Sequence, residues 1–396
     1  MTELTEAQIE ARDWAREFAR RSIAPRALLL DKDPESPERG TLIKEACEAG
    51  IMGMSLPEAL GGTGLDPVAG ALVTEELAAA CSGCTVLFGA TSLGLAPILA
   101  SFDPALLERF VKPLVESWLT DDPEMAALAA TEPEMGSDFI LGDDTARMRT
   151  RIERRDGGYL INGTKIFISN GSIASLVTVF GRLDPDKPMR ESIVCLAVPS
   201  DTPGFSVGQV FDKMGQRASP AAELVFDDVF VPRENRVGAE GAGWSINRVI
   251  MSVSRIPVAA IGLGIARAAY ERALEYAEGR VQGGRPIVGH QAMQVMLADM
   301  AIRVEAARGL AMNAAEAVAR GAPSLKLSSM AKTFAGDAAV ANATDAIQVM
   351  GGHGYIHEYG VEKLLRDAKL CQIYEGTNQI NRFEIMESIA QERTTP

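Results

Sequence analysis

The spacing of apolar and polar positions divides the chain into a helical first third, a middle part of short strands and a second helical part. Near the N-terminus, Thr5 and Gln8 fit a capping box, and Trp14 and Phe18 then fall four residues apart on one helical face. Further helical patterns, separated by Pro and Gly breaks, cover residues 41–49, 67–80 and 104–116. The pattern predicts a helical N-terminal domain that ends near residue 124.

After residue 124 the helical pattern gives way to short segments rich in β-branched and aromatic residues. Turn signals separate them, for example Asp156-Gly157-Gly158 and Asn170-Gly171. The predicted strands lie within residues 159–162, 165–169, 175–181, 192–198 and 223–231. Spacing of this kind is typical of an antiparallel β-domain, which we place at residues 125–237.

A glycine-rich linker at residues 238–243 precedes long Ala-rich helical patterns. These patterns cover residues 244–282, 290–319, 324–351, 358–370 and 379–392. Long helices with short connections favour an antiparallel bundle. The sequence therefore predicts three domains, at residues 1–124, 125–237 and 238–396.

The charge of the chain excludes one large class of partner. Lys and Arg number 39 against 53 Asp and Glu, a net charge of −14. Nucleic-acid binding needs a cationic footprint, so we expect none, although a phosphorylated small molecule needs only a few local cations. The longest uninterrupted apolar run, residues 256–266, is too short to span a membrane, and the N-terminus shows no secretory signal. We expect a cytoplasmic protein with no membrane partner.

The five cysteines do not indicate a metal or redox site. Cys81 and Cys84 have redox-motif spacing, but they lie in an Ala-rich helical stretch without a His or a second pair. We interpret them as packing thiols in a reducing compartment and expect no metal. Gly262 and Gly264 resemble the start of a dinucleotide fingerprint, but the third glycine is replaced by Arg267 in a helical context.

Four segments carry candidate chemistry, and each alone has an ordinary structural explanation. The segments are residues 128–138, 163–171, 213–229 and 374–379. The first reads as a capped loop, the second as the edge of a β-hairpin, and a lone carboxylate such as Glu375 in the fourth reads as a solvated loop residue.

The order and spacing of these segments together resemble the acyl-CoA dehydrogenase family over nearly the whole chain. The segments 330–337, 347–352 and 365–369 also match, and the C-terminal half looks closest to the medium- and short-chain members. The resemblance implies an α+β fold with an N-terminal α-helical domain, a middle antiparallel β-barrel-like domain and a C-terminal four-helix bundle. It also implies a homotetramer with FAD near the subunit interfaces, an acyl-CoA substrate and electron-transfer flavoprotein as acceptor.

The resemblance implies a set of cofactor residues. Thr131 and Ser169 correspond to hydrogen-bond partners of the flavin ring, Phe167 packs on the ring, and Arg280 reaches the FAD pyrophosphate, typically on a neighbouring subunit. The full set is Leu128, Thr131, Ser137, Phe167, Ser169, Arg280, Gln282, Gln291, Gln348, Gly351, Gly352, Thr377 and Gln379. The implied substrate residues are Ser137, Arg255, Tyr374 and Gly376.

The chain departs from the family pattern at three places. Gly283-Gly284 stands where relatives often have a Phe-Gly pair near the cofactor. Leu128 replaces an aromatic residue, and Ser252 stands where relatives may carry an acid that meets the pantetheine. These departures put the cofactor and CoA contacts at those positions in doubt, but not the fold.

The catalytic base occupies one of two positions in this family. One immediately precedes the cleft arginine, and here it is Ser254, which cannot accept a proton at neutral pH; the other is Glu375. The resemblance therefore implies that Glu375 removes the substrate α-proton while the β-hydrogen leaves as hydride to flavin N5, giving a trans-2-enoyl-CoA. We expect burial to raise the pKa of Glu375, and the Glu375 N–H with a ribityl hydroxyl to hold the thioester oxygen.

The acyl pocket and the electron acceptor leave alternatives open. In relatives part of the pocket floor matches residues 86–99, which contain no Lys or Arg here. A second carboxylate on the acyl tail could not be buried unpaired, so we favour an uncharged aliphatic, branched or alicyclic tail. The alternatives to a dehydrogenase are an acyl-CoA oxidase that uses oxygen, or a non-catalytic partner subunit that binds FAD or acyl-CoA.

Overall fold

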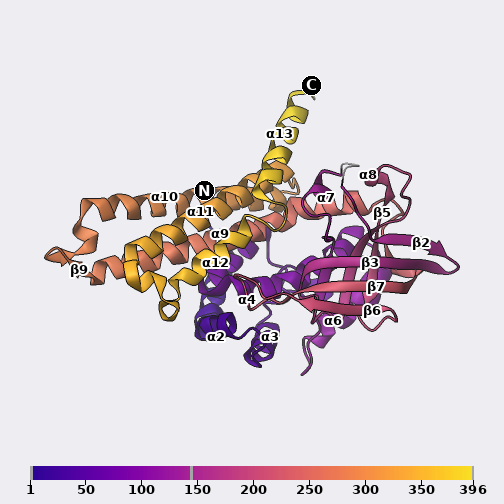
Figure 1. Cartoon of the computed structure of the whole chain (residues 1–396), viewed down its shortest axis with the longest axis horizontal. Helices are drawn as coiled ribbons and strands as arrows, with labels where there is room; N and C mark the ends of the chain where they lie inside the picture. The colour runs from indigo at the N-terminus through magenta and orange to yellow at the C-terminus, as the bar shows by residue number, and fades with distance from the viewer. Residues whose placement is uncertain (1–2, 143–145, 395–396) are drawn as a thin grey trace.

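A computed structural model describes residues 3–142 and 146–394 of the chain. Long C-terminal helices extend to one side, a β-sheet lies at the other, and the N-terminal helices run beneath both (Figure 1). The N-terminal helices are α1 (Glu6–Phe18), α2 (Ala27–Lys32), α3 (Glu38–Glu48), α4 (Pro67–Ser101), α5 (Pro104–Leu106) and α6 (Lys112–Ser117). The predicted capping box is confirmed: the Thr5 hydroxyl accepts from the Gln8 N–H at 3.3 Å, and the Gln8 side chain accepts from the Thr5 N–H at 3.1 Å.

Helix α4 is longer than the sequence pattern predicts. It begins after Asp66, whose carboxylate accepts the first N–H groups, with Pro67 in the first turn. The backbone leaves the helical conformation at Cys81 (φ −162°, ψ 109°), close to the predicted end at residue 80, and the helix then continues to Ser101. The second half is buried on several sides, so it lacks the polar stripe that reveals a surface helix. All five cysteines are buried and free.

The middle of the chain forms an eight-stranded sheet. Its strands are β1 (Ala126–Ala129), β2 (Arg151–Arg155), β3 (Gly158–Ser169), β4 (Leu176–Arg182), β5 (Ile193–Pro199), β6 (Phe205–Val210), β7 (Ala221–Pro232) and β8 (Arg236–Val237). The order is β6-β7-β3-β2-β4-β5-β8, with β1 beside β4. The long pairs β3–β7 and β4–β5 are antiparallel, as predicted, while β1 runs parallel to β4. The sequence pattern did not predict β1, β2, β6 or β8, which are short or largely exposed.

The C-terminal part is the predicted bundle of long helices. They are α9 (Gly243–Gly279), α10 (Gln291–Ala319), α11 (Leu325–Met350), α12 (Val361–Cys371) and α13 (Asn378–Thr394). Helix α9 packs chiefly against α11 and against α4 of the N-terminal part, through small side chains such as Ala259, Ala260 and Ala335. A hairpin of β9 (Val281–Gln282) and β10 (Arg285–Pro286) joins α9 to α10 at one end of the bundle (Figure 1). The outer end of α13 projects away from it.

Two helices, α4 and α9, are long and apolar enough to cross a membrane by length and composition. The sequence-based expectation considered only uninterrupted apolar runs and so missed them. In the structure 67% of the apolar window of α4 and 78% of that of α9 are buried inside the protein. Their apolar surface therefore belongs to the core, and core helices of soluble proteins pass the same test.

Candidate active site

The predicted base lies in a short loop, residues 372–377, between α12 and α13; we call it the base loop. Glu375 has φ +55°, in the left-handed region that side-chain-bearing residues rarely adopt, and Gly376 follows with φ +82°. A Cβ atom at Gly376 would lie 2.7 Å from Ile140 Cδ1, and the positive φ of this residue itself favours glycine. A strained conformation persists only where its surroundings hold it.

Helix α9 holds Glu375 from one side. The Ser254 hydroxyl donates to Glu375 Oε2 at 2.9 Å, and Arg255 Nε donates to the Glu375 carbonyl at 3.1 Å. Arg255 is fully buried, forms an ion pair with the equally buried Glu384 at 2.6 Å and donates to Ser329 Oγ at 2.8 Å. Arg255 therefore contacts the backbone of the base, while its charge is paired with Glu384.

Burial raises the pKa of the Glu375 carboxyl, although the residue keeps some solvent-accessible surface. The hydrogen bond from Ser254 and the positive charges of Arg255 and Lys332 lower this pKa, but burial outweighs them. A raised pKa makes a carboxylate a stronger base, and it is the direction expected of a proton-abstracting group.

Helix α11 holds the next residue of the loop. Lys332 Nζ donates to the Gly376 carbonyl at 2.6 Å and to Asn378 Oδ1 at 2.9 Å, and Asn381 Nδ2 donates to the same carbonyl at 2.8 Å. Lys332 is fully buried and forms no ion pair among the residues that the structure describes; burial lowers its pKa to about 8. Lys332 was not among the predicted site residues, although it lies in the segment 330–337 that matches the family pattern.

The base loop also meets the segment 128–138. The Thr377 N–H donates to Ser137 Oγ at 3.0 Å, which joins two residues of the predicted site from distant parts of the chain. Tyr374 lies beside Cys371, its hydroxyl 3.7 Å from the sulfur, and burial raises its pKa well above the usual range. The structure thus brings five predicted site residues together here, namely Ser137, Arg255, Tyr374, Gly376 and Thr377, around Glu375, while Gln379 is exposed on α13.

A second group of predicted residues lies on the sheet. The Thr131 carbonyl accepts from the Ile166 N–H at 2.9 Å, which places Thr131 beside Phe167. Phe167 is 60% exposed, and its backbone has φ +60°. The centroid of its ring lies 4.9 Å from that of Phe211. Leu128 is partly buried in β1 and Ser169 ends β3.

A buried ion pair fixes the segment around Thr131 to strand β3. Lys165 and Glu132 are fully buried, their charged atoms 2.8 Å apart, and Lys165 also donates to the Ala130 carbonyl at 2.9 Å. Burial acts to raise the pKa of Glu132, but Lys165 lowers it overall. An exposed aromatic ring held near hydroxyl groups fits a planar ring system with polar edges, so these residues are suited to a flavin.

The remaining predicted residues gather at the other end of the bundle, which we call the distal end. They are Arg280, Gln282, Gln291, Gln348, Gly351 and Gly352, and all are exposed. Gly283 and Gly284 form the two-residue turn between β9 and β10 with φ +59° and +80°. Positive φ at both central positions is typical of a type I′ hairpin turn, so turn geometry explains the Gly-Gly pair.

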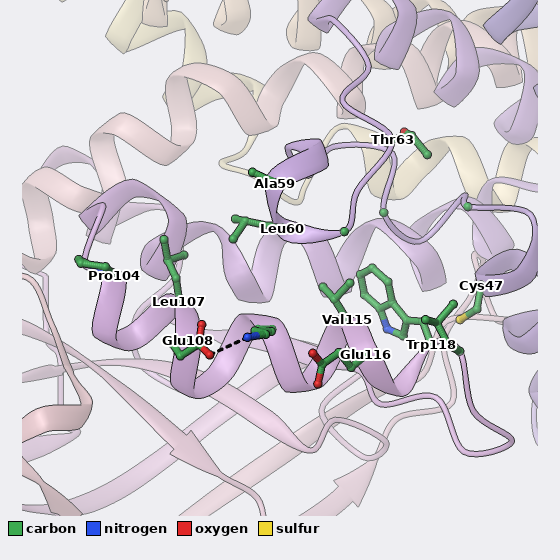
Figure 2. Close-up of a pocket in the computed structure, with 15 residues that line it drawn as sticks. Cys47, Ala59, Leu60, Thr63, Pro104, Leu107, Glu108, Val115, Glu116 and Trp118 are labelled. Atoms are coloured by element: carbon green, nitrogen blue, oxygen red, sulfur yellow. Dashed lines mark hydrogen bonds and ion pairs between the residues drawn. The ribbon is translucent and has the colours of Figure 1, made fainter.

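A separate cavity of about 540 Å³ lies in the N-terminal part of the molecule. Figure 2 shows Trp118, Val115, Leu60 and Leu107 around it, with an ion pair between Glu108 and Lys112 at its edge. None of the predicted site residues lines it. Among the described residues no group of three or more His, Cys, Asp or Glu could hold a metal ion. The predicted site residues therefore lie outside this cavity.

Comparison with known proteins agrees with this architecture. Models of the acyl-CoA dehydrogenase N-terminal, middle and C-terminal domains match residues 5–117, 127–229 and 241–390. An acyl-CoA dehydrogenase of Bacillus subtilis is 42% identical over 383 residues, which cover 96% of this chain and 97% of the relative. A cyclohex-1-ene-1-carbonyl-CoA dehydrogenase of Geobacter metallireducens is also 42% identical, over 97% of this chain and 98% of its own length.

Solved structures show the same likeness. Butyryl-CoA dehydrogenase from Megasphaera elsdenii superimposes with a TM-score of 0.91 at 36% identity, over 98% of this chain and 100% of that one. A chain from a structure described as the electron transferring flavoprotein of Acidaminococcus fermentans also gives 0.91, at 37% identity over 98% and 99% of the two chains. The predicted three-domain α+β fold is confirmed, and the chain belongs to the acyl-CoA dehydrogenase family of FAD-dependent oxidoreductases.

Proposed function

We propose that this protein removes two hydrogens from the α and β carbons of an acyl-CoA thioester to give the trans-2-enoyl-CoA, with Glu375 as the base for the α-proton. The observation that carries this proposal is the geometry of Glu375. Its backbone is held in a left-handed conformation, its carboxylate accepts from Ser254, and burial raises its pKa. A preorganised, desolvated carboxylate is the group that abstraction of a weakly acidic proton needs.

The cofactor in this proposal is FAD. We assign Thr131, Ser137, Ser169 and Thr377 to its polar edges and the exposed face of Phe167 to its ring, with Leu128 and Gln379 at the margins of the same surface. When bound, FAD supplies the acceptor for the hydride that leaves the β carbon. The protein's own contribution is to place the substrate between this surface and Glu375 and to exclude water.

The base loop supplies the remaining chemistry of the chain itself. Glu375 takes the α-proton on its carboxylate, and its backbone N–H is assigned to the thioester oxygen, where negative charge develops. Tyr374 and Gly376 border the substrate, and buried Arg255 keeps the loop in place through the Glu375 carbonyl. Because the loop is already held, little reorganisation accompanies the reaction.

We further propose that the distal end serves the cofactor of another copy of the chain in a homotetramer. Arg280 lies 25 residues after Arg255 on α9 and its cap, about 37 Å along the axis, so it cannot contact the site around its own Glu375. Large apolar side chains are exposed on α10 and α13, which suits an interface between subunits. They are Val295, Ile302, Phe383 and Met386.

The acyl tail in this proposal is uncharged, and the electron acceptor is electron-transfer flavoprotein. Residues 86–99 of α4 carry no cation that could pair a second carboxylate. The Geobacter metallireducens relative is named for a ring-bearing thioester, and the Megasphaera elsdenii structure for butyryl-CoA, both uncharged tails. The structural likeness to a chain described with an electron transferring flavoprotein supports the acceptor.

The test of the function is flavin reduction in the Glu375→Gln variant. We expect the variant to purify yellow, because FAD binding uses other residues, and to lose flavin bleaching by acyl-CoA by roughly 10²–10⁴-fold or more. The matched control is Glu387→Gln, an exposed carboxylate on the neighbouring α13, which should bleach like the wild type. Anaerobic stopped-flow mixing with short, medium, branched and ring-bearing acyl-CoA thioesters measures the rate.

Two results would contradict the proposal. Bleaching of Glu375→Gln at the wild-type rate would exclude Glu375 as the base. If no acyl-CoA of the panel bleaches the flavin of the wild type, the dehydrogenation itself is excluded and a non-catalytic binding subunit is favoured. Rapid peroxide formation by the reduced wild type in air would replace electron-transfer flavoprotein with oxygen and indicate an oxidase.

A further inference from the structure

Two consecutive residues of α9 hold Glu375 in different ways. Arg255 binds its backbone carbonyl, and Ser254 binds its carboxylate. We propose that Ser254 is a positioning residue for the base: its hydroxyl fixes Glu375 Oε2 and so aims Oε1 at the substrate α-proton. This inference rests on the proposed role of Glu375 and adds to it a residue that does not itself exchange a proton with substrate.

The need for such a residue follows from how the loop is held. Arg255 fixes the Glu375 carbonyl, while Lys332 and Asn381 fix the next one, so the backbone is defined on two sides. None of these contacts fixes the Glu375 side chain, which still rotates about three bonds. The hydrogen bond from Ser254 at 2.9 Å removes that freedom, because fixing one carboxylate oxygen places the other.

A neutral hydroxyl suits this task better than a cation. An Arg or Lys paired with Glu375 would stabilise the charged carboxylate strongly, lower its pKa and weaken it as a base. The nearest guanidinium, that of Arg255, is already engaged by Glu384 at 2.6 Å and Ser329 at 2.8 Å. Ser254 therefore fixes the direction of the carboxylate while lowering its pKa less than a paired cation would.

The charged and titratable groups that surround the Glu375 carboxylate come from helices α9, α11 and α13 and from the base loop itself. Arg255 on α9 forms an ion pair with Glu384 of α13. Lys332 on α11 has a pKa of about 8, and the pKa of Tyr374 within the loop lies well above its usual range. The acid side of the pH profile therefore reports Glu375, and the alkaline side reports Lys332.

The test compares Ser254→Ala with Ser254→Thr, which keeps a hydroxyl. The control is Ser245→Ala, at the exposed start of the same helix, where the hydroxyl caps the Ala242 carbonyl at 2.8 Å. We expect Ser254→Ala to reduce flavin roughly tenfold more slowly at saturating acyl-CoA. Because the lost hydrogen bond stabilised the charged form, the acid limb should also move up by roughly one pH unit. Ser254→Thr and Ser245→Ala should keep the wild-type rate and profile.

A second measurement is independent of turnover. Infrared difference spectra between each protein and its Glu375→Gln counterpart isolate this carboxyl, and titrating its protonated C=O band gives the midpoint directly. The inference is supported if the midpoint is higher in Ser254→Ala but unchanged in Ser254→Thr. An unchanged midpoint in Ser254→Ala, or an equal change in Ser254→Thr, overturns it whether or not the protein turns over acyl-CoA. If Ser254→Ala shows the higher midpoint but the wild type never bleaches with acyl-CoA, the proposed function is contradicted while the hydrogen bond from Ser254 to Glu375 is supported.

Discussion

The base loop and the distal end of the bundle carry residues of the same predicted site, yet they differ in burial and in partners. At the base loop, each backbone carbonyl of Glu375 and Gly376 accepts from a buried side chain. At the distal end, Arg280 is exposed and forms no ion pair among the described residues. The base loop satisfies its own buried polar groups within one chain, whereas the exposed Arg280 is left to water or to the contact with another subunit that we propose.

The difference predicts that changes at the base loop act on stability or on the chemistry of the reaction, and changes at the distal end on cofactor binding alone. The largest effect should come from Glu384→Gln. Glu384 is fully buried and pairs with Arg255 and Arg248, so its loss leaves two guanidinium groups near α13 without their partner. Breaking a buried ion pair costs about 3–5 kcal/mol. We expect a clearly lower melting temperature by calorimetry.

The matched control for Glu384→Gln is Glu387→Gln, one turn further along α13 and exposed. Its free energy of unfolding should change by no more than about 0.5 kcal/mol, the range of surface substitutions, so its melting temperature should stay close to that of the wild type. Equal melting temperatures for Glu384→Gln and Glu387→Gln would show that the Arg255 pair does not anchor the loop.

Next in size is the effect of Lys332→Met on the reaction. Among the residues that the structure describes, the Gly376 carbonyl would keep Asn381 alone as side-chain donor, so the loop around Glu375 loosens. We expect flavin reduction to slow by roughly 10–100-fold, the size of a lost hydrogen bond to a charged group. The melting temperature should change little, because removing a desolvated ammonium offsets the lost hydrogen bonds. Stopped-flow bleaching and calorimetry measure the two effects.

The pH dependence gives a second test of Lys332. Its pKa of about 8 in the folded protein lies below the usual value of 10.5, so between these values the unfolded chain binds more protons. The contribution of Lys332 to stability therefore rises as pH increases through this window, while its hold on Gly376 as an ammonium weakens. Wild-type flavin reduction should fall above about pH 8. If flavin reduction by Lys332→Met falls in the same way above about pH 8, the fall belongs to another titrating group.

A smaller effect concerns how the charged Glu375 carboxylate lowers the free energy of unfolding at neutral pH. Because the pKa of Glu375 is raised in the folded protein, folding favours the protonated form, and this contribution to stability is lost as pH rises through that pKa. The neutral isostere in Glu375→Gln should therefore stabilise the protein at neutral pH, by about 0.5–2 kcal/mol. Calorimetry at pH 7.5 and 4.5 tests the sign: the gain should shrink in acid. An equal gain at both pH values would exclude titration of Glu375 as its cause.

The sequence predicts the elements that depend on local patterns. The capping box at Thr5, the long C-terminal helices and the strands that became β3, β4, β5 and β7 all follow from neighbouring residues. Strand β1 could not be predicted in this way, because only four residues pair and their partner β4 lies some fifty residues later. The interruption at Cys81 also hid the second half of α4, since burial on several sides removes the polar stripe.

The site shows the same division between features set by neighbouring residues and features set by distant contacts. Glu375 was predicted from its motif, and Ser254 was recognised only as a position without a base. The hydrogen bond that joins them spans 121 residues of sequence, and those from Lys332 to Gly376 and from Thr377 to Ser137 span 44 and 240. Contacts of this kind depend on how helices and sheet pack, so a local pattern carries no signal for them.

The smallest effect on the folded chain should come from Arg280→Gln at the distal end. Arg280 is exposed, so its replacement should change stability by no more than about 0.5 kcal/mol. If it contacts FAD of another subunit, the affinity for FAD should still fall, by at most about fivefold for a partly exposed charge pair. The ratio of flavin to protein absorbance after dialysis measures this loss. Arg285→Gln, on the same hairpin and bonded to His290 at 3.3 Å, is the control and should keep its flavin. Full flavin retention in Arg280→Gln would remove the reason to separate the two regions, because the distal end would then be an ordinary solvated surface.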